Sequence, residues 1–249
     1  MTTYEQYRRV RREFMGRDPV FDVRPGTSDV DSVNEVFDHN SYRSRKHGLA
    51  VESGETWLDL GANIGAFSVL AVRLGAHVHA YEADATNAAL TAHNLDRNTL
   101  TAAQHQVHHA AVVADDDARP TVTLHTNSTP LGLRRHSIVR RREASTPVAV
   151  PAVRFGDAVA RAGATAAKLN IEGAEIALLQ AAIPRGLHGL TKLAVEWSFD
   201  VDPRLATLKA VVSGLERAGY YVGLSKRVDW TKPTWDHYPP NIFLYVRKL

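Results

Sequence analysis

The segment from Asp59 to Gly65 and the acidic residue Glu82 have the residue types and the spacing of a nucleoside-binding site. The segment reads Asp-Leu-Gly-Ala-Asn-Ile-Gly, and Glu82 follows Gly61 by 21 positions. Glycines let a backbone approach a ligand that a side chain would exclude, and a helix that begins after them offers unpaired N–H groups. Dinucleotide-type folds place the carboxylate that binds ribose hydroxyls at this distance, after a second strand.

The turn differs from that of an NAD site, because Asn63 stands where the fingerprint G-x-G-x-x-G has its second glycine. That glycine makes room for a pyrophosphate. A bulkier, polar turn suits S-adenosylmethionine, which has no pyrophosphate and whose amino acid end can take hydrogen bonds from the turn. A tight strand–helix turn without a ligand is the alternative, and the presence of Glu82 makes it less attractive.

A second group of polar residues follows two later strands of the predicted sheet. Lys168, Asn170, Glu172 and Glu175 lie in or directly after one strand, and Glu196 ends the next. Ligands of open α/β sheets bind outside the carboxyl ends of the strands, so we expect these side chains to meet at one edge. Two structural interpretations stay open. Glu172 and Glu175 could complement the charge of a helix N-terminus, and Lys168 could serve as an ion-pair partner for one of them.

The elements that must position these residues alternate along the chain from Thr56 onward. Apolar periodicity predicts strands at 56–60, 77–81, 107–113, 166–170 and 193–196, and a closing antiparallel pair at 220–224 and 242–246. Helices are expected at 66–74, 86–98, 155–162, 175–182 and 205–218. This alternation predicts an α/β fold, a doubly wound, Rossmann-like and mostly parallel sheet with helices on both faces.

We expect one large domain, residues 51–249, which binds the cofactor and carries the catalytic residues. Residues 1–50 are expected to form a polar, partly helical lead-in or cap. Residues 115–151 break the alternation and are expected to be an inserted, turn-rich loop with short strands at 122–124 and 148–150.

The composition is that of an ordinary globular protein, with 249 residues, 44% hydrophobic and 23% charged. No apolar run approaches the roughly 20 residues that cross a bilayer, and the N-terminus has no apolar signal region. The chain has no cysteine, which excludes disulfides and thiolate ligands. We therefore expect a cytoplasmic protein without a membrane partner.

The net charge is +3, and most of the excess comes from two arginine groups, at 8–12 and 134–142. Such groups could bind phosphates, but they are short and lack interleaved aromatic residues. A solvated helix face or loop is the favoured interpretation. His105, His108 and His109 have a weakly metal-like spacing, but a strand-edge surface is favoured and no metal is expected.

Three segments of the chain resemble the FkbM family of S-adenosylmethionine-dependent methyltransferases. They are residues 57–67 (WLDLGANIGAF), Tyr81-Glu82 with 93–98 (HNLDRN), and 168–175 (KLNIEGAE). The lead-in from Asn34 through Tyr42 is also similar to the family's approach to its first strand. The resemblance covers about residues 30–246 and implies a seven-stranded class I methyltransferase fold.

The resemblance also implies roles for individual residues. Asp59, Gly61, Asn63 and Gly65 would hold the methionine end of S-adenosylmethionine, and Glu82 would bind the ribose hydroxyls. Ala62, Ala83, Ala111 and Asn170 would also contact the cofactor. Asn170, Glu172 and Glu175 would line the acceptor site, with Lys168 and Glu196 beside them. The family commonly has aspartate where this chain has Asn170, so Glu172, Glu175 or Glu196 becomes the expected base.

The expected reaction is O-methylation of a hydroxyl on a small molecule or sugar, in the manner of natural product biosynthesis. Residues 127–142 and 226–241 are expected to roof the acceptor pocket, and the second segment carries aromatic residues: Trp230, Trp235, His237 and Tyr238. Packing of these aromatics against the domain body is the favoured alternative to stacking on a substrate. Two rival functions stay open, a nucleic-acid methyltransferase and a non-catalytic cofactor-binding module.

Overall fold

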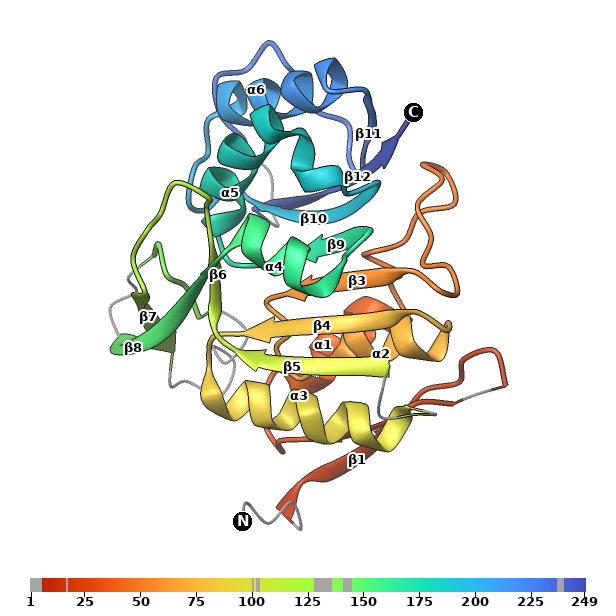
Figure 1. Cartoon of the computed structure of the whole chain (residues 1–249). Helices are drawn as coiled ribbons and strands as arrows, with labels where there is room; N and C mark the ends of the chain where they lie inside the picture. The colour runs from red at the N-terminus through yellow and green to blue at the C-terminus, as the bar shows by residue number, and fades with distance from the viewer. Residues whose placement is uncertain are drawn as a thin grey trace.

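The computed structural model describes residues 6–16, 18–99, 101, 104–127, 136–140, 145–236 and 240–249. Its main sheet has seven strands in the order β11-β12-β10-β9-β3-β4-β5 (Figure 1). The strands are β3 (Thr56–Leu60), β4 (His77–Glu82), β5 (His105–His109), β9 (Ala166–Leu169), β10 (Lys192–Ser198), β11 (Tyr220–Leu224) and β12 (Asn241–Lys248). Strand β12 pairs antiparallel with both β10 and β11, and the other pairings are parallel. The predicted closing antiparallel pair is confirmed.

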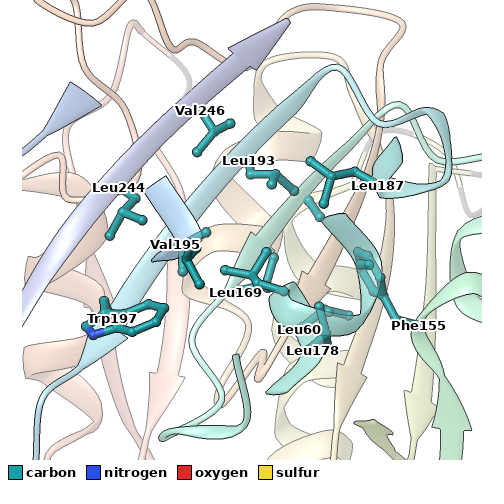
Figure 2. Packing of buried hydrophobic residues seen from close by; sticks show 14 of the residues in the cluster. Leu60, Phe155, Leu169, Leu178, Leu187, Leu193, Val195, Trp197, Leu244 and Val246 are labelled. Atoms are coloured by element: carbon teal, nitrogen blue, oxygen red, sulfur yellow. The ribbon is translucent and has the colours of Figure 1, made fainter. Parts of the chain in front are cut away.

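Helices cover both faces of this sheet. They are α1 (Asp29–Phe37), α2 (Ala66–Arg73), α3 (Ala85–Asn98), α4 (Phe155–Ala162), α5 (Ala174–Ala182) and α6 (Leu205–Arg217), with a 3-10 segment, η4 (Ile183–Gly189), after α5. Helices α4, α5 and α6 pack into one buried cluster, and α1, α2 and α3 pack into another. The sheet lies between the two clusters. In β3, for example, Leu58 and Leu60 point into the first cluster and Trp57 into the second. Figure 2 shows part of the first cluster, with Leu60 and Leu169 between α5 and the sheet.

Residues 107–113 do not form the single strand that their apolar pattern predicts. Strand β5 ends at His109, and Ala110 donates its backbone N–H to the Glu82 carbonyl. The chain then enters a second sheet of order β6-β8-β7, formed by β6 (Ala111–Val113), β7 (Thr121–Asn127) and β8 (Ser145–Arg154). Strand β7 and the first part of β8 lie within residues 115–151, the expected insertion. The small sheet has its own buried cluster, which includes Val113, Val122 and Leu124.

Three of the four N-terminal arginines, Arg8, Arg9 and Arg11, lie on a strand, and Arg12 directly follows it. Strand β1 (Arg8–Arg11) pairs antiparallel with β2 (Val20–Val23), and Val10 is its buried residue. Arg9 and Arg12 pair with Asp22 and Asp38. Arg140 of the second group pairs with Asp200. Four other arginines of that group lie outside the described residues: Arg134, Arg135, Arg141 and Arg142.

Two asparagines of α3 attach this hairpin to the main domain. Asn94 accepts the Asp22 N–H at 2.9 Å and donates to the Asp22 and Ile64 carbonyls at 3.3 and 2.9 Å. Asn98 accepts the Val20 N–H at 2.9 Å and donates to the Val20 carbonyl at 2.7 Å. The asparagine side chains therefore bond β2 as a neighbouring strand would, and Asn94 also reaches the glycine turn.

Replacing Asn94 with alanine is expected to lower the free energy of unfolding by about 2–3 kcal/mol. The change leaves the Asp22 N–H and the Ile64 carbonyl buried without their partners, and each such group costs about 1–3 kcal/mol. Urea unfolding followed by circular dichroism measures this loss. Gln180→Ala, which removes an exposed amide side chain from α5, is the control, and an equal effect of both changes would contradict the role of Asn94.

Within the described part of the chain, no helix combines the length and the apolarity that a membrane span requires. The same residues contain no cluster of three or more histidine, aspartate or glutamate side chains able to hold a metal ion. His108 instead stacks on Tyr81, with ring centroids 4.4 Å apart.

Candidate active site

A cavity that opens to solvent lies at the carboxyl ends of the parallel strands. Many of the residues predicted for the site line it: Gly61, Ala62, Asn63, Glu82, Ala83, Ala111, Lys168, Asn170, Glu172 and Glu196. The cavity lies where an open α/β sheet binds its ligands. Asp59, Gly65 and Glu175, which were expected at the same site, do not line it.

The glycine turn is held in a conformation that few residues adopt. Gly61 and Asn63 have φ of +74° and +55°. A Cβ on Gly61 would lie 1.9 Å from the Asn170 carbonyl oxygen, so only glycine fits between β3 and the end of β9. Asn63 donates its N–H to Glu82 at 2.7 Å and accepts the Thr91 hydroxyl at its carbonyl at 2.5 Å. The turn is therefore fixed from both sides before any ligand binds.

Glu82, the last residue of β4, presents a carboxylate to the cavity. One oxygen accepts the Asn63 N–H and the other accepts the Asp84 N–H at 2.9 Å. Each oxygen retains a further lone pair for a ligand hydroxyl. Burial raises the pKa of Glu82 to about 7, although its two backbone hydrogen bonds act in the opposite direction.

The affinity of this site for an adenosyl ligand is expected to rise with pH through about 7. A ribose bound at Glu82 would donate its hydroxyls to the ionised carboxylate, so below the Glu82 pKa of about 7 the affinity should fall by nearly ten-fold per pH unit. Calorimetric titration of S-adenosylhomocysteine between pH 5.5 and 8.5 measures this dependence. The same titration of Glu82→Gln should give a flat profile, and a persisting slope would assign the titration to another group.

Asp59 and Lys168 form a buried ion pair beneath the turn. They are register partners on β3 and β9, and their charged atoms lie 2.9 Å apart. Ser68 of α2 donates to the other Asp59 oxygen at 2.6 Å, and Lys168 donates to the Gly61 carbonyl at 2.8 Å. The expected direct contact of Asp59 with the cofactor does not fit this placement, because its side chain has no exposed surface. Its carboxylate supports the turn from below.

Gly65 also lies away from the cavity. It precedes α2 with φ of +84°, and a Cβ there would meet Thr91 at 3.1 Å. Its lack of a side chain allows α2 and α3 to approach each other, and the next two residues, Ala66 and Phe67, line the cavity.

The carboxylates Glu172 and Glu175 have different environments, although they are three positions apart. Glu172 has φ of +52° and lines the cavity. Glu175 is fully buried and accepts backbone N–H groups of Gly173 and Ser198, at 2.8 and 2.9 Å. Burial raises its pKa to about 7. The expectation that Glu175 lines the acceptor site is therefore not met, because its oxygens are bonded within the protein.

Several residues that sequence analysis assigned no role in the site also line the cavity: Ser32 and Glu35 of α1, Tyr42, Asn87 and His136. Nδ1 of His136 lies 3.7 Å from an Asp84 carboxylate oxygen. The resemblance of residues 34–42 was the available signal for Tyr42, whereas no sequence pattern marked His136.

The two segments expected to roof the pocket contribute unequally. His136 and Ile138 of the first line the cavity, and 128–135 and 141–142 lie outside the described residues. In the second, Trp235 stacks on Phe199 with ring centroids 4.7 Å apart. The favoured packing role thus applies to Trp235. Trp230 lies on the surface, outside the cavity lining, and His237 and Tyr238 are outside the described residues.

Comparison with known proteins gives no match to a protein-family model and no match to a curated protein. Solved structures do match. One, from Streptococcus mutans and described as a SAM-dependent methyltransferase, has a TM-score of 0.50 and 12% identity, over 96% of this chain and 55% of that chain. The chain has the class I methyltransferase fold.

Two further structures are similar at lower scores. Methyltransferase FkbM from Methylobacillus flagellatus has a TM-score of 0.49 and 22% identity, over 83% of this chain and 47% of that chain. An rRNA methylase from Streptococcus thermophilus has a TM-score of 0.47 and 12% identity, over 80% of this chain and 89% of that chain. This chain spans about half the length of the matched chains from Streptococcus mutans and Methylobacillus flagellatus. The predicted fold class is confirmed, with the mostly parallel seven-stranded sheet and its two helical layers.

Proposed function

We propose that this protein is an S-adenosylmethionine-dependent methyltransferase that methylates a hydroxyl group of a small molecule or sugar. The observation that carries the proposal is that the glycine turn, Glu82 and the polar ends of β9 and β10 line one cavity in a class I methyltransferase fold. The turn and the carboxylate suit an adenosyl amino acid, and the strand ends beyond them suit an acceptor.

The order of the strands gives the direction in which the cofactor would lie. Glu82 on β4 would bind the ribose, and the turn after β3 would lie under the sulfonium. The uncapped N-terminus of α2, where Ala66 and Phe67 line the cavity, would bind the methionine carboxylate. From β4 to β10 there are three strand spacings, about 14 Å, which accommodates the extended cofactor and an acceptor.

Methyl transfer breaks the sulfonium–methyl bond as the acceptor oxygen attacks from the opposite side. The donor is already activated, so the protein contributes mainly by positioning the two reactants. A hydroxyl acceptor must also lose its proton, which a nearby carboxylate can take. Glu172 is our candidate for this base, because it lines the cavity and Glu175 does not.

Calorimetric titration of S-adenosylmethionine and S-adenosylhomocysteine into the purified protein tests the cofactor, and we expect micromolar affinity. A methyl-labelled donor incubated with sugars, polyhydroxylated small molecules and, separately, total RNA then tests the acceptor. Label in the small-molecule fraction supports the proposal. Salt-sensitive labelling of RNA would identify a nucleic-acid methyltransferase instead. Cofactor binding without methyl transfer to any fraction would favour a non-catalytic cofactor-binding module. Failure of a well-folded protein to bind the cofactor would reject the small-molecule methyltransferase, the nucleic-acid methyltransferase and the non-catalytic module alike.

Glu172→Gln is expected to reduce the rate of methyl transfer by about 10²–10⁴-fold, the usual contribution of a general base. S-adenosylhomocysteine affinity should stay nearly unchanged, since the product has no acceptor to deprotonate. The matched change Glu175→Gln should mainly lower the melting temperature, because it disturbs bonds to Gly173 and Ser198. Full activity of Glu172→Gln with the true acceptor would remove Glu172 from this role.

A further inference from the structure

Tyr42 connects four separate parts of the chain at one end of the cavity. Its hydroxyl lies 3.0 Å from a Glu196 carboxylate oxygen on β10 and 2.9 Å from the Asn170 side-chain nitrogen after β9. Asn241, the first residue of β12, donates to the other Glu196 oxygen. Tyr42 itself comes from the segment after α1 and is almost completely buried. The hydroxyl is therefore the meeting point of this network.

The chemistry of these groups fixes the direction of each hydrogen bond. A carboxylate only accepts, and a tyrosine hydroxyl has one proton to donate. The Tyr42 proton therefore goes to Glu196, and the hydroxyl oxygen must accept from Asn170. Burial and the charges of Glu35 and Glu196 raise the pKa of Tyr42, so the hydroxyl keeps that proton at neutral pH.

The same logic orients the Asn170 amide. Its NH₂ group faces Tyr42, so its side-chain oxygen must lie on the opposite side of the amide. Asn170 lines the cavity, and it is separated from the ribose-binding Glu82 by β3. Two strand spacings amount to about 10 Å, which puts the amide at the end of the cavity where methyl transfer would occur.

We propose that Tyr42 is a positioning residue that turns the side-chain oxygen of Asn170 toward the reacting end of the cavity, where it accepts a hydrogen bond from the acceptor hydroxyl. This inference rests on the proposed function and specifies its acceptor subsite. A hydroxyl that donates to this oxygen keeps a lone pair available for the methyl group.

The change Tyr42→Phe distinguishes the role of the hydroxyl from the role of the ring. The ring packs edge-on against Phe67 and Phe243, with centroids 5.7 and 5.4 Å apart, and lies 5.3 Å from the Lys168 ammonium. Phenylalanine keeps these contacts and loses only the acceptor for the Asn170 N–H and the donor to Glu196. The Asn170 amide is then free to rotate its oxygen away from the cavity.

The affinities of two cofactor analogues report the orientation of the Asn170 amide, and this test does not require the methyl acceptor to be known. S-adenosylhomocysteine has no hydrogen-bond donor at the position of the transferred methyl group, whereas sinefungin has an amine there. For Tyr42→Phe we expect sinefungin affinity to fall about ten-fold and S-adenosylhomocysteine affinity to change less than about two-fold. Tyr245→Phe is the matched control, because its hydroxyl donates to the Ser41 carbonyl and lies outside the cavity lining.

A double-mutant cycle tests whether Tyr42 acts through Asn170. Asn170→Ala should cause a similar loss of sinefungin affinity, and Tyr42→Phe with Asn170→Ala should lose no more than Asn170→Ala alone. Additive losses would show that Tyr42 acts independently and would overturn the inference. An unchanged ratio of the two affinities in Tyr42→Phe would also overturn it. Failure of the wild type to bind either ligand would instead reject the proposed function.

Reversing the polarity of the network gives a second test that uses melting temperature alone. Asn170→Asp places two carboxylates beside the Tyr42 hydroxyl, which can donate its one proton to only one of them. The variant should therefore be less stable than the wild type. Adding Glu196→Gln supplies an NH₂ group to Tyr42 while its oxygen still accepts from Asn241. The double variant should therefore regain most of the lost stability. A double variant less stable than Asn170→Asp would contradict the assigned directions.

Discussion

Replacing Glu82 with alanine is expected to lower the affinity for S-adenosylmethionine by about a thousand-fold. In the proposed complex, two ribose hydroxyls would donate to this carboxylate. Each lost bond would cost about 2 kcal/mol, and every 1.4 kcal/mol is a factor of ten. The change also removes the group that holds the Asn63 and Asp84 N–H groups, so the turn loses its support. Calorimetric titration at pH 8, where the wild-type carboxyl is ionised, measures the effect.

Two other variants show whether this loss is specific. Glu82→Gln keeps the size of the side chain and should bind with intermediate affinity, because its amide offers one acceptor oxygen. Glu55→Gln changes a carboxylate that pairs with Lys192, away from the cavity, and should leave the affinity unchanged. If Glu82→Ala binds as tightly as the wild type, the ribose does not lie at Glu82 and the proposed direction of the cofactor is wrong.

Lys168→Met is expected to lower the free energy of unfolding by about 3–5 kcal/mol, the cost of leaving one buried charge without its partner. Asp59 would remain fully buried without its ion pair, and the Gly61 carbonyl would lose its donor. For a chain of this size the melting temperature should fall by roughly 10 °C, which differential scanning calorimetry detects.

The double variant Asp59→Asn with Lys168→Met provides the control for this prediction. Removing both charges should restore part of the stability, since the cost comes from the uncompensated charge and not from the lost attraction alone. A double variant that is less stable than Lys168→Met by the full effect of Asp59→Asn would show that the two residues act independently.

The different environments of Glu172 and Glu175 illustrate what a sequence leaves open. Glu172 and Glu175 are three positions apart, and spacing alone could not separate a role in the cavity from a role inside the protein. The left-handed backbone at Glu172 and the bonds of Glu175 to Gly173 and Ser198 decide between them. Neither observation follows from residue types, since each depends on how the loop after β9 meets the end of β10.

The sequence by itself determined the alternation of strands and helices, the glycine turn and the carboxylate at the end of β4, because these depend on residues close together in the chain. Only the tertiary structure decided that Asp59 lies below the site with Lys168 and that Tyr42 lies within it. Tyr42 meets Asn170 and Glu196 across 128 and 154 positions. Contacts at such separations are set by the packing of α1 and its following segment against the sheet, and no local pattern encodes them.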